Sequence, residues 1–121
     1  NFMIESFKET ISTATRFLDN VIDYNMDRHA LEDQKKNAFN DRRIGLGILG
    51  LGDMLVKMGI KYDSEDALQT VEQVMEIFRE TSYETSAQLA KEKGQFPNFN
   101  WEGYSKSKFV KSLPNSIKKN N

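Results

Sequence analysis

The 121-residue sequence contains no cysteine, one histidine and two prolines. The absence of cysteine excludes disulfides, thiolate metal ligands and any thiol nucleophile or thiyl radical within this chain. The single histidine, His29, is too little for a cysteine–histidine pair or a convincing serine–histidine–aspartate triad. Chemistry that needs sulfur must therefore be carried elsewhere.

Net charge and long apolar runs are also lacking. Seventeen basic and eighteen acidic side chains leave a formal charge of -1, so no overall field attracts nucleic acid or an anionic membrane. No apolar run reaches the ~18 residues of a membrane span, and residues 1–5 lack the basic start of a signal peptide. We expect a cytoplasmic protein without nucleic-acid or membrane partners. Because the chain starts without methionine inside a helical pattern, we also expect a piece of a longer protein.

Apolar residues recur at steps of three and four along most of the chain, which is typical of amphipathic helices. Ser64 is a predicted N-cap, and Gly59 and Gly94 are predicted helix ends. No convincing strand alternation is visible. We predict a single all-α segment over residues 1–121, a bundle of two long and two or three short helices. Its parts are a helix over 1–24, a short helix over 30–40, a glycine-rich helix over 44–58, a long helix over 64–93, and an aromatic loop, short helix and tail over 95–121.

Four glycines, at positions 45, 47, 50 and 52, interrupt an apolar run that is entered through Arg42 and Arg43. Inside a helix each glycine costs about 1 kcal/mol relative to alanine, so the run needs a spatial reason. The first three match the G-x-G-x-x-G spacing of a dinucleotide-binding turn, with Asp66 at a suitable distance. No strand and βαβ unit is predicted around them, however. We therefore favour a close-packing surface that lets a helix approach its neighbour.

The remaining candidate sites have ordinary structural alternatives. Arg42 and Arg43 could bind a phosphate or carboxylate, or form ion pairs with Asp41 or Asp53. A ladder of glutamates resembles the carboxylate face of a di-iron bundle, but histidine ligands are missing and His29 falls in a predicted turn, so a solvated acidic face is favoured. Three aromatic residues could stack on bases, but without a basic groove they are better explained as part of the core. The ladder is Glu72, Glu76, Glu80 and Glu84, and the aromatic residues are Phe96, Phe99 and Trp101.

Four stretches, taken together and in order, resemble the large catalytic subunit of ribonucleotide reductase. They are Arg16-Phe17-Leu18-Asp19-Asn20-Val21-Ile22-Asp23, the run from Arg42 to Leu55, Tyr62-Asp63-Ser64-Glu65, and Leu89-Ala90-Lys91-Glu92-Lys93-Gly94-Gln95-Phe96-Pro97. The resemblance is closest to the adenosylcobalamin-dependent class II enzymes and related class I enzymes. It implies an internal piece of a larger, ten-stranded α/β barrel enzyme that reduces ribonucleotides to deoxyribonucleotides.

The same resemblance implies that the reaction centre lies outside this chain. In the family the radical cysteine belongs to an Asn-x-Cys-x-Glu loop upstream, and a Pro-Thr-Gly-Thr phosphate loop follows downstream; neither motif occurs here. We accordingly expect no catalytic, cofactor-binding or metal-binding residue in this chain. We also expect no cofactor of its own, although the parent enzyme could use adenosylcobalamin. Whether that parent takes diphosphates or triphosphates stays open.

These features predict a helical scaffold segment that is inactive alone and packs against the remainder of the catalytic subunit. Apolar faces left open in isolation would favour homo-oligomers, for example by exchange of a helix. The alternative is a stand-alone helical interaction module, derived from a reductase gene, that binds a protein through its loop from Phe96 to Trp101. A nucleotide-binding protein using the glycine run is a third hypothesis, for which we expect no saturable NAD or ATP binding.

Overall fold

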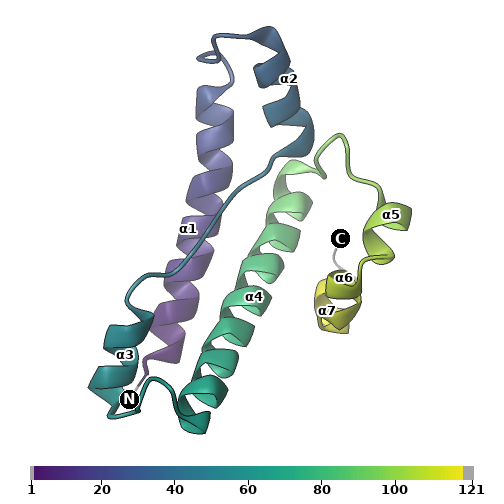
Figure 1. Cartoon of the computed structure of the whole chain (residues 1–121). Helices are drawn as coiled ribbons and strands as arrows, with labels where there is room; N and C mark the ends of the chain where they lie inside the picture. Colours follow the sequence, from purple (N-terminus) through teal and green to yellow (C-terminus); the bar gives the residue numbers. More distant parts are fainter. Residues whose placement is uncertain (1, 119–121) are drawn as a thin grey trace.

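In the computed structural model, which describes residues 2–118, two long helices lie side by side (Figure 1). Helix α1 spans Ile4–Asn25 and α4 spans Glu65–Lys93. Both run in the same direction, because residues near the start of α1 contact the middle of α4 and residues further along α1 contact its end. The ring centroids of Phe7 and Phe78 are 6.4 Å apart, and Arg16 contacts Glu92 at 2.7 Å.

Two helices that point the same way need a connection that returns the chain to its starting end. The return consists of α2 (Glu32–Asp41), an extended segment over residues 43–50, and α3 (Leu51–Met58) (Figure 1). The predicted turn before α2 is confirmed, since α1 ends at Asn25. Figure 1 shows the extended segment running back along α1 to α3.

The predicted glycine-rich helix over 44–58 is wrong in its first half, because helix begins only at Leu51. Gly50 has φ +76°, a left-handed angle outside the right-handed helix, and takes the N-cap position instead. Isoleucine at 44 and 48 favours extended backbone, and glycine at 45 and 47 has poor helix propensity. Local preference at these isoleucine and glycine positions therefore opposes a helix, although Leu46 and Leu49 are compatible with one.

The predicted boundaries of the long helix are confirmed by its caps. The backbone N–H of Ala67 donates to Ser64 Oγ at 3.2 Å, and Ser64 lies just outside the first turn. At the other end, Gly94 has φ +88° and donates its N–H to the Ala90 carbonyl at 2.9 Å. Gly59 ends α3 in the left-handed conformation, with φ +73°, as predicted.

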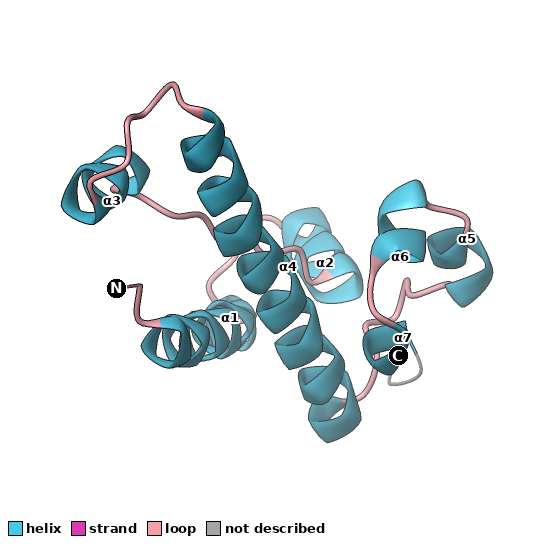
Figure 2. Ribbon diagram, turned by 90° about the horizontal axis from the view of Figure 1, so that it is seen from below, coloured by secondary structure: helices cyan, strands magenta, loops and turns pink. Residues whose placement is uncertain are grey.

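After α4 the chain forms three short helices in place of the single one expected in 95–121. These are α5 (Trp101–Ser105), α6 (Lys108–Ser112) and α7 (Asn115–Lys118). They lie beside α4, as the two views agree (Figures 1 and 2), and α7 packs against it. Val110, Leu113 and Ile117 are buried there. The last predicted tail residues, 119–121, lie outside the described part.

Among the described residues, the buried apolar side chains come from several helices, with the largest share from α4. They are Ile11, Leu55, Ala67, Val74, Ala87, Leu89, Val110, Leu113 and Ile117. Two threonines, Thr15 and Thr81, share this interior, and Thr15 Oγ1 donates to the Ile11 carbonyl at 2.8 Å. The all-α architecture is confirmed, since the described residues contain helices and no strand. Every helix in residues 2–118 is too short or too polar to cross a membrane.

Candidate functional site

An ionic cluster joins α1, the end of α2 and the end of α4. Arg42 is its centre: Nε and Nη2 donate to Asp19 Oδ1 at 3.0 and 2.7 Å, and Nη2 also donates to the Asp19 carbonyl at 3.2 Å. Nη1 donates to Asp23 Oδ1 at 2.6 Å. The side chains of Arg42 and Asp19 are only 15% and 13% exposed, so this contact is largely screened from water.

Lys93, in the last turn of α4, completes the cluster. Its Nζ donates to Asp19 Oδ2 at 2.6 Å, to Asn20 Oδ1 at 2.8 Å and to Asp23 Oδ2 at 2.9 Å. Each of the two aspartates thus accepts from both cations. Residues 19 and 23 are one helical turn apart, so they present their carboxylates on one side of α1.

The cluster shifts the pKa values of Asp23, Arg42 and Lys93. Hydrogen bonds from Arg42 and then Lys93 lower the pKa of Asp23 to about 2. The hydrogen bond to Asp23 raises the pKa of Arg42, and burial only partly opposes this. Burial by itself would lower the pKa of Lys93, but its hydrogen bonds to Asp19 and Asp23 outweigh burial and raise it. Asp23, Arg42 and Lys93 are therefore charged at neutral pH.

A second ion pair extends the junction along α1 and α4. Arg16 Nη1 and Nη2 donate to the two oxygens of Glu92 at 2.7 and 2.9 Å, the paired geometry that suits a guanidinium and a carboxylate. Gln88 also donates to Glu92. The hydrogen bond from Arg16, followed by that from Gln88, lowers the pKa of Glu92 to about 2. Water reaches this pair, so it adds less than the Arg42 cluster.

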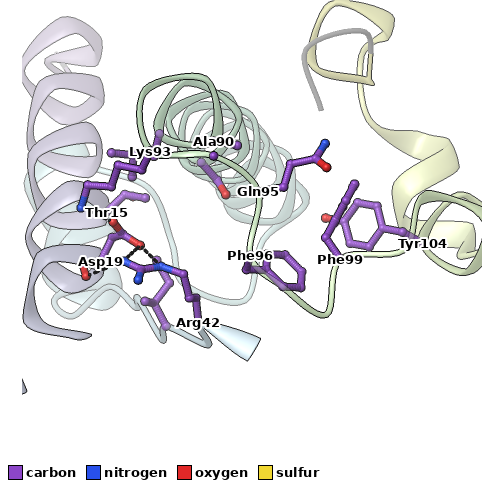
Figure 3. Close-up of a pocket in the computed structure, with 13 residues that line it drawn as sticks. Thr15, Asp19, Arg42, Ala90, Lys93, Gln95, Phe96, Phe99 and Tyr104 are labelled. Carbon is purple, nitrogen blue, oxygen red and sulfur yellow. Dashed lines mark hydrogen bonds and ion pairs between the residues drawn. The ribbon is translucent and has the colours of Figure 1, made fainter. Parts of the chain in front are cut away.

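Beside the cluster lies a small pocket of about 130 Å³. Figure 3 shows Asp19, Arg42 and Lys93 at one side and the rings of Phe96, Phe99 and Tyr104 at the other. Because both cations already contact aspartates, the pocket offers no uncompensated charge to a phosphate. The ion pairs among Asp19, Asp23, Arg42 and Lys93 hold α1, α2 and α4 together, and we call this set of residues the clasp. The hypothesis that Arg42 binds a ligand gains no support.

The aromatic loop folds back and packs on itself, but it does not enter the core as expected, because Phe96 and Phe99 are only half-buried and Trp101 is exposed. The centroid of the Phe99 ring lies 5.3 Å from that of Phe96 and 5.5 Å from that of Tyr104. Asn98 ties the loop to α2 through its N–H to the Asn40 carbonyl at 3.0 Å and its Nδ2 to Asp41 Oδ1 at 2.7 Å. Burial, followed by contact with Tyr83, raises the pKa of Tyr104 to about 12. Trp101 stays 42% exposed at the edge.

The structure also locates the other predicted candidates. Arg43 pairs with Asp41 at 3.3 Å, one of the two partners considered, whereas Arg42 pairs with neither Asp41 nor Asp53. Of the glutamate ladder, Glu76 and Glu80 contact Arg79 at 3.4 and 3.5 Å. His29 lies in the connection between α1 and α2. Within residues 2–118, no three or more histidine, cysteine, aspartate or glutamate side chains come together as a metal site would require.

The glycine run does not pack closely on anything in the described part of the chain. A Cβ added at Gly45, Gly47, Gly50 or Gly52 would meet no atom within 4 Å. The close-packing explanation is therefore wrong for contacts within this chain. The run does lead in extended form to the start of α3, as a dinucleotide turn would, but no sheet accompanies it in residues 2–118.

Sequence reasoning missed most of the clasp. It named Arg42 and expected a carboxylate partner near it in sequence, but Asp19, Asp23 and Lys93 were not singled out as partners. The available signal was the i, i+4 spacing of the two aspartates on an amphipathic helix. Nothing local in the sequence links that pair to position 42 or 93.

Comparison with known proteins decides the family. The sequence model of the ribonucleotide reductase barrel domain matches residues 1–120. The chain belongs to the ribonucleotide reductase family. No match to a solved structure reaches significance.

Relatives in this family carry two kinds of name. The chain is 45% identical over 93 residues to a vitamin B12-dependent ribonucleoside-diphosphate reductase of Thermoplasma acidophilum, which covers 77% of this chain and 12% of the relative. It is 36% identical over 110 residues to the enzyme of that name from Mycobacterium tuberculosis, covering 91% and 15%. It is 38% identical over 95 residues to a ribonucleoside-diphosphate reductase subunit alpha of Chlamydia trachomatis, covering 78% and 9%. The chain thus spans a small part of each relative.

Proposed function

We propose that this chain is a scaffold segment of a ribonucleotide reductase catalytic subunit, and that it has no reductase activity alone. The observation that carries the proposal is the extended segment over residues 43–50, whose backbone groups are left available for pairing with another part of the enzyme. Within residues 2–118 the backbone groups of residues 44–49 make no hydrogen bond. Backbone N–H and C=O groups in the interior of a complete fold are almost always paired.

The side chains of this segment support the same proposal. Leu46 and Ile48 are half-buried, whereas the alternate positions Gly45, Gly47 and Leu49 are open, and Leu49 is fully exposed. A period of two with one covered face is the pattern of a strand. The segment also runs across α1 in the direction opposite to that of both α1 and α4 (Figure 1). We infer that strands of the remaining catalytic subunit pair with residues 43–49.

The absence of a cysteine that could carry a thiyl radical supports the predicted inactivity of the isolated chain. Reduction through a thiyl radical needs a cysteine, and this sequence has none. Two relatives are named vitamin B12-dependent, so we infer that the parent enzyme uses adenosylcobalamin. The pocket of about 130 Å³ beside the ionic cluster is too small to enclose a corrin ring, and within residues 2–118 no three or more histidine, cysteine, aspartate or glutamate side chains come together. We assign no cobalamin contact to this chain.

A chimera tests the scaffold role. The aligned 93 residues of the Thermoplasma acidophilum relative would be replaced by the matching part of this chain, and reduction of ribonucleoside diphosphates would be measured with that enzyme's cofactor. We expect turnover by the chimera and none by the isolated chain. Turnover by the isolated chain would refute its inactivity, and a folded chimera without turnover would count against a purely structural role.

A further inference from the structure

Residue 42 has a backbone conformation that its residue type disfavours. Arg42 is the C-cap of α2 with φ +42°, and among residues 2–118 it is the only non-glycine residue with a positive φ. Left-handed backbone is common for glycine and asparagine and uncommon for residues with a long side chain. The chain changes there from helix to the extended segment, so this one angle directs the path of residues 43–50.

Local contacts do little to hold that path. The backbone of residues 44–49 makes no hydrogen bond within the described chain, and Arg43 is 87% exposed with one long contact to Asp41. The Arg42 side chain, by contrast, makes four hydrogen bonds to Asp19 and Asp23. Asp19 and Asp23 are themselves fixed from the other side by Lys93.

We propose that Arg42 is a conformational lock, whose contacts with Asp19 and Asp23 hold residue 42 left-handed and thereby direct residues 43–50 back along α1. In this role the side chain compensates for an unfavourable backbone angle. The lock also makes the path depend on α4, because Lys93 shares both aspartates. It goes beyond the scaffold role, since it concerns how this chain orders its own segment.

Substitution at residue 42 separates this lock from a simple backbone preference. Arg42→Gly relieves the disfavoured angle and removes the side chain, whereas Asp19→Asn leaves the backbone at residue 42 unchanged and removes the acceptor charge. If the contacts of Arg42 with Asp19 and Asp23 hold the segment, residues 43–50 lose their fixed path along α1 in both variants. If backbone preference governs the path, Arg42→Gly holds the segment at least as well as arginine and Asp19→Asn has no effect.

Because the chain has no cysteine, two introduced cysteines can be spin-labelled selectively. Labels at Leu49→Cys and Glu84→Cys, both exposed positions, report the distance from the extended segment to α4 by double electron–electron resonance. We expect one narrow distance distribution in the otherwise unchanged chain, and loss of that peak in Arg42→Gly and Asp19→Asn. Arg42→Lys keeps the positive charge but not the planar guanidinium group, so it should keep part of the narrow distance peak.

The control is Arg43→Gln, which should leave the distribution narrow. A narrow peak in Arg42→Gly, or a broad distribution in the unchanged chain, would overturn the lock. Helix content from circular dichroism shows whether a variant stays folded. If Arg42→Gly loses helix, Asp19→Asn decides the question: a narrow peak in that variant refutes the proposal and a lost peak with helix retained supports it.

Discussion

Arg42 and Arg43 are adjacent residues of the same type in opposite surroundings. The Arg42 side chain is 15% exposed between two aspartates, whereas that of Arg43 is 87% exposed beside one. Removal of one partner from a buried ion pair costs ~3 to 5 kcal/mol, and from an exposed pair less than ~1 kcal/mol. Sequence position therefore says little about what each arginine contributes.

The two positions make a matched pair of variants. Because the cluster is only partly buried, we expect Arg42→Met to lower the free energy of unfolding by about 2 kcal/mol. Arg43→Met should change it by less than about 0.5 kcal/mol. Urea unfolding followed by circular dichroism measures both values. Equal effects of the two substitutions would show that the cluster does not stabilise the chain.

The lowered pKa values of Asp23 and Glu92 predict that the folded chain loses stability in acid. Their pKa values are about 2 in the folded chain, against ordinary values of 3.8 and 4.5. A carboxyl whose pKa is lowered by folding stabilises the fold above its unfolded pKa, and that contribution is lost as pH falls toward its folded pKa. We expect the urea midpoint to be level near neutrality and to fall between about pH 4.5 and pH 2.

Substitution of the two carboxyls tests whether they cause this fall of the urea midpoint at low pH. The double variant Asp23→Asn and Glu92→Gln should show a flatter fall over the same range. Glu72→Gln serves as a control, because the Glu72 side chain makes no ion pair within residues 2–118. If the double variant kept the full acid slope, other carboxyls would have to cause it.

At the scale of the elements, helix α4 begins at a serine whose side chain caps it. Ser64 accepts from the Ala67 N–H, whereas Ser107 stands before α6 without a side-chain cap hydrogen bond. We expect Ser64→Ala to lower the free energy of unfolding by about 1 kcal/mol. Ser107→Ala should change it by only a few tenths. A thermal or urea unfolding series compares the two, and equal losses would contradict a specific role for the cap.

The glycines before α3 differ in what they require. Gly50 has φ +76°, so alanine there is strained, whereas Gly47 has open space and no positive φ. We expect Gly50→Ala to destabilise the chain by about 1 kcal/mol. Gly47→Ala should be neutral or stabilise it slightly, because it restricts the unfolded chain. Unfolding midpoints of the two variants test this, and a large loss from Gly47→Ala would indicate a close contact at that glycine.

At the scale of the whole molecule, large apolar side chains remain uncovered. Phe17, Leu49, Val56 and Leu68 are 64%, 101%, 77% and 66% exposed. Helix α1 contacts α4 on one side and leaves Phe17 open on another. Uncovered apolar surface of this kind favours association.

We therefore expect the isolated chain to self-associate as its concentration rises. Light scattering coupled to size-exclusion chromatography would show a mass that grows with loading. The double variant Leu49→Glu and Leu68→Glu should shift the chain toward the monomer, whereas Gln69→Glu, which adds charge beside Leu68, should not. A monomer at every concentration would contradict this prediction.

Much of the fold could be predicted from sequence because its signals are local. The helical period, the Ser64 cap and the ends at Gly59 and Gly94 depend on neighbouring residues, and each was confirmed. The glycine run misled the prediction because its apolar residues fit a helix as readily as a strand. The clasp was not predictable, since Asp19 and Lys93 are far apart in sequence.

The sequence by itself determined the helices, their caps, the family resemblance and the absence of thiol chemistry, because these depend on residue types and short spacings. Only the tertiary structure decided that α1 and α4 run in the same direction, since that follows from the returning path of residues 43–50. The tertiary structure likewise decided that Arg42 forms ion pairs with Asp19 and Asp23. Ion pairs between distant segments form only when packing brings their helices together, and composition carries no record of that geometry.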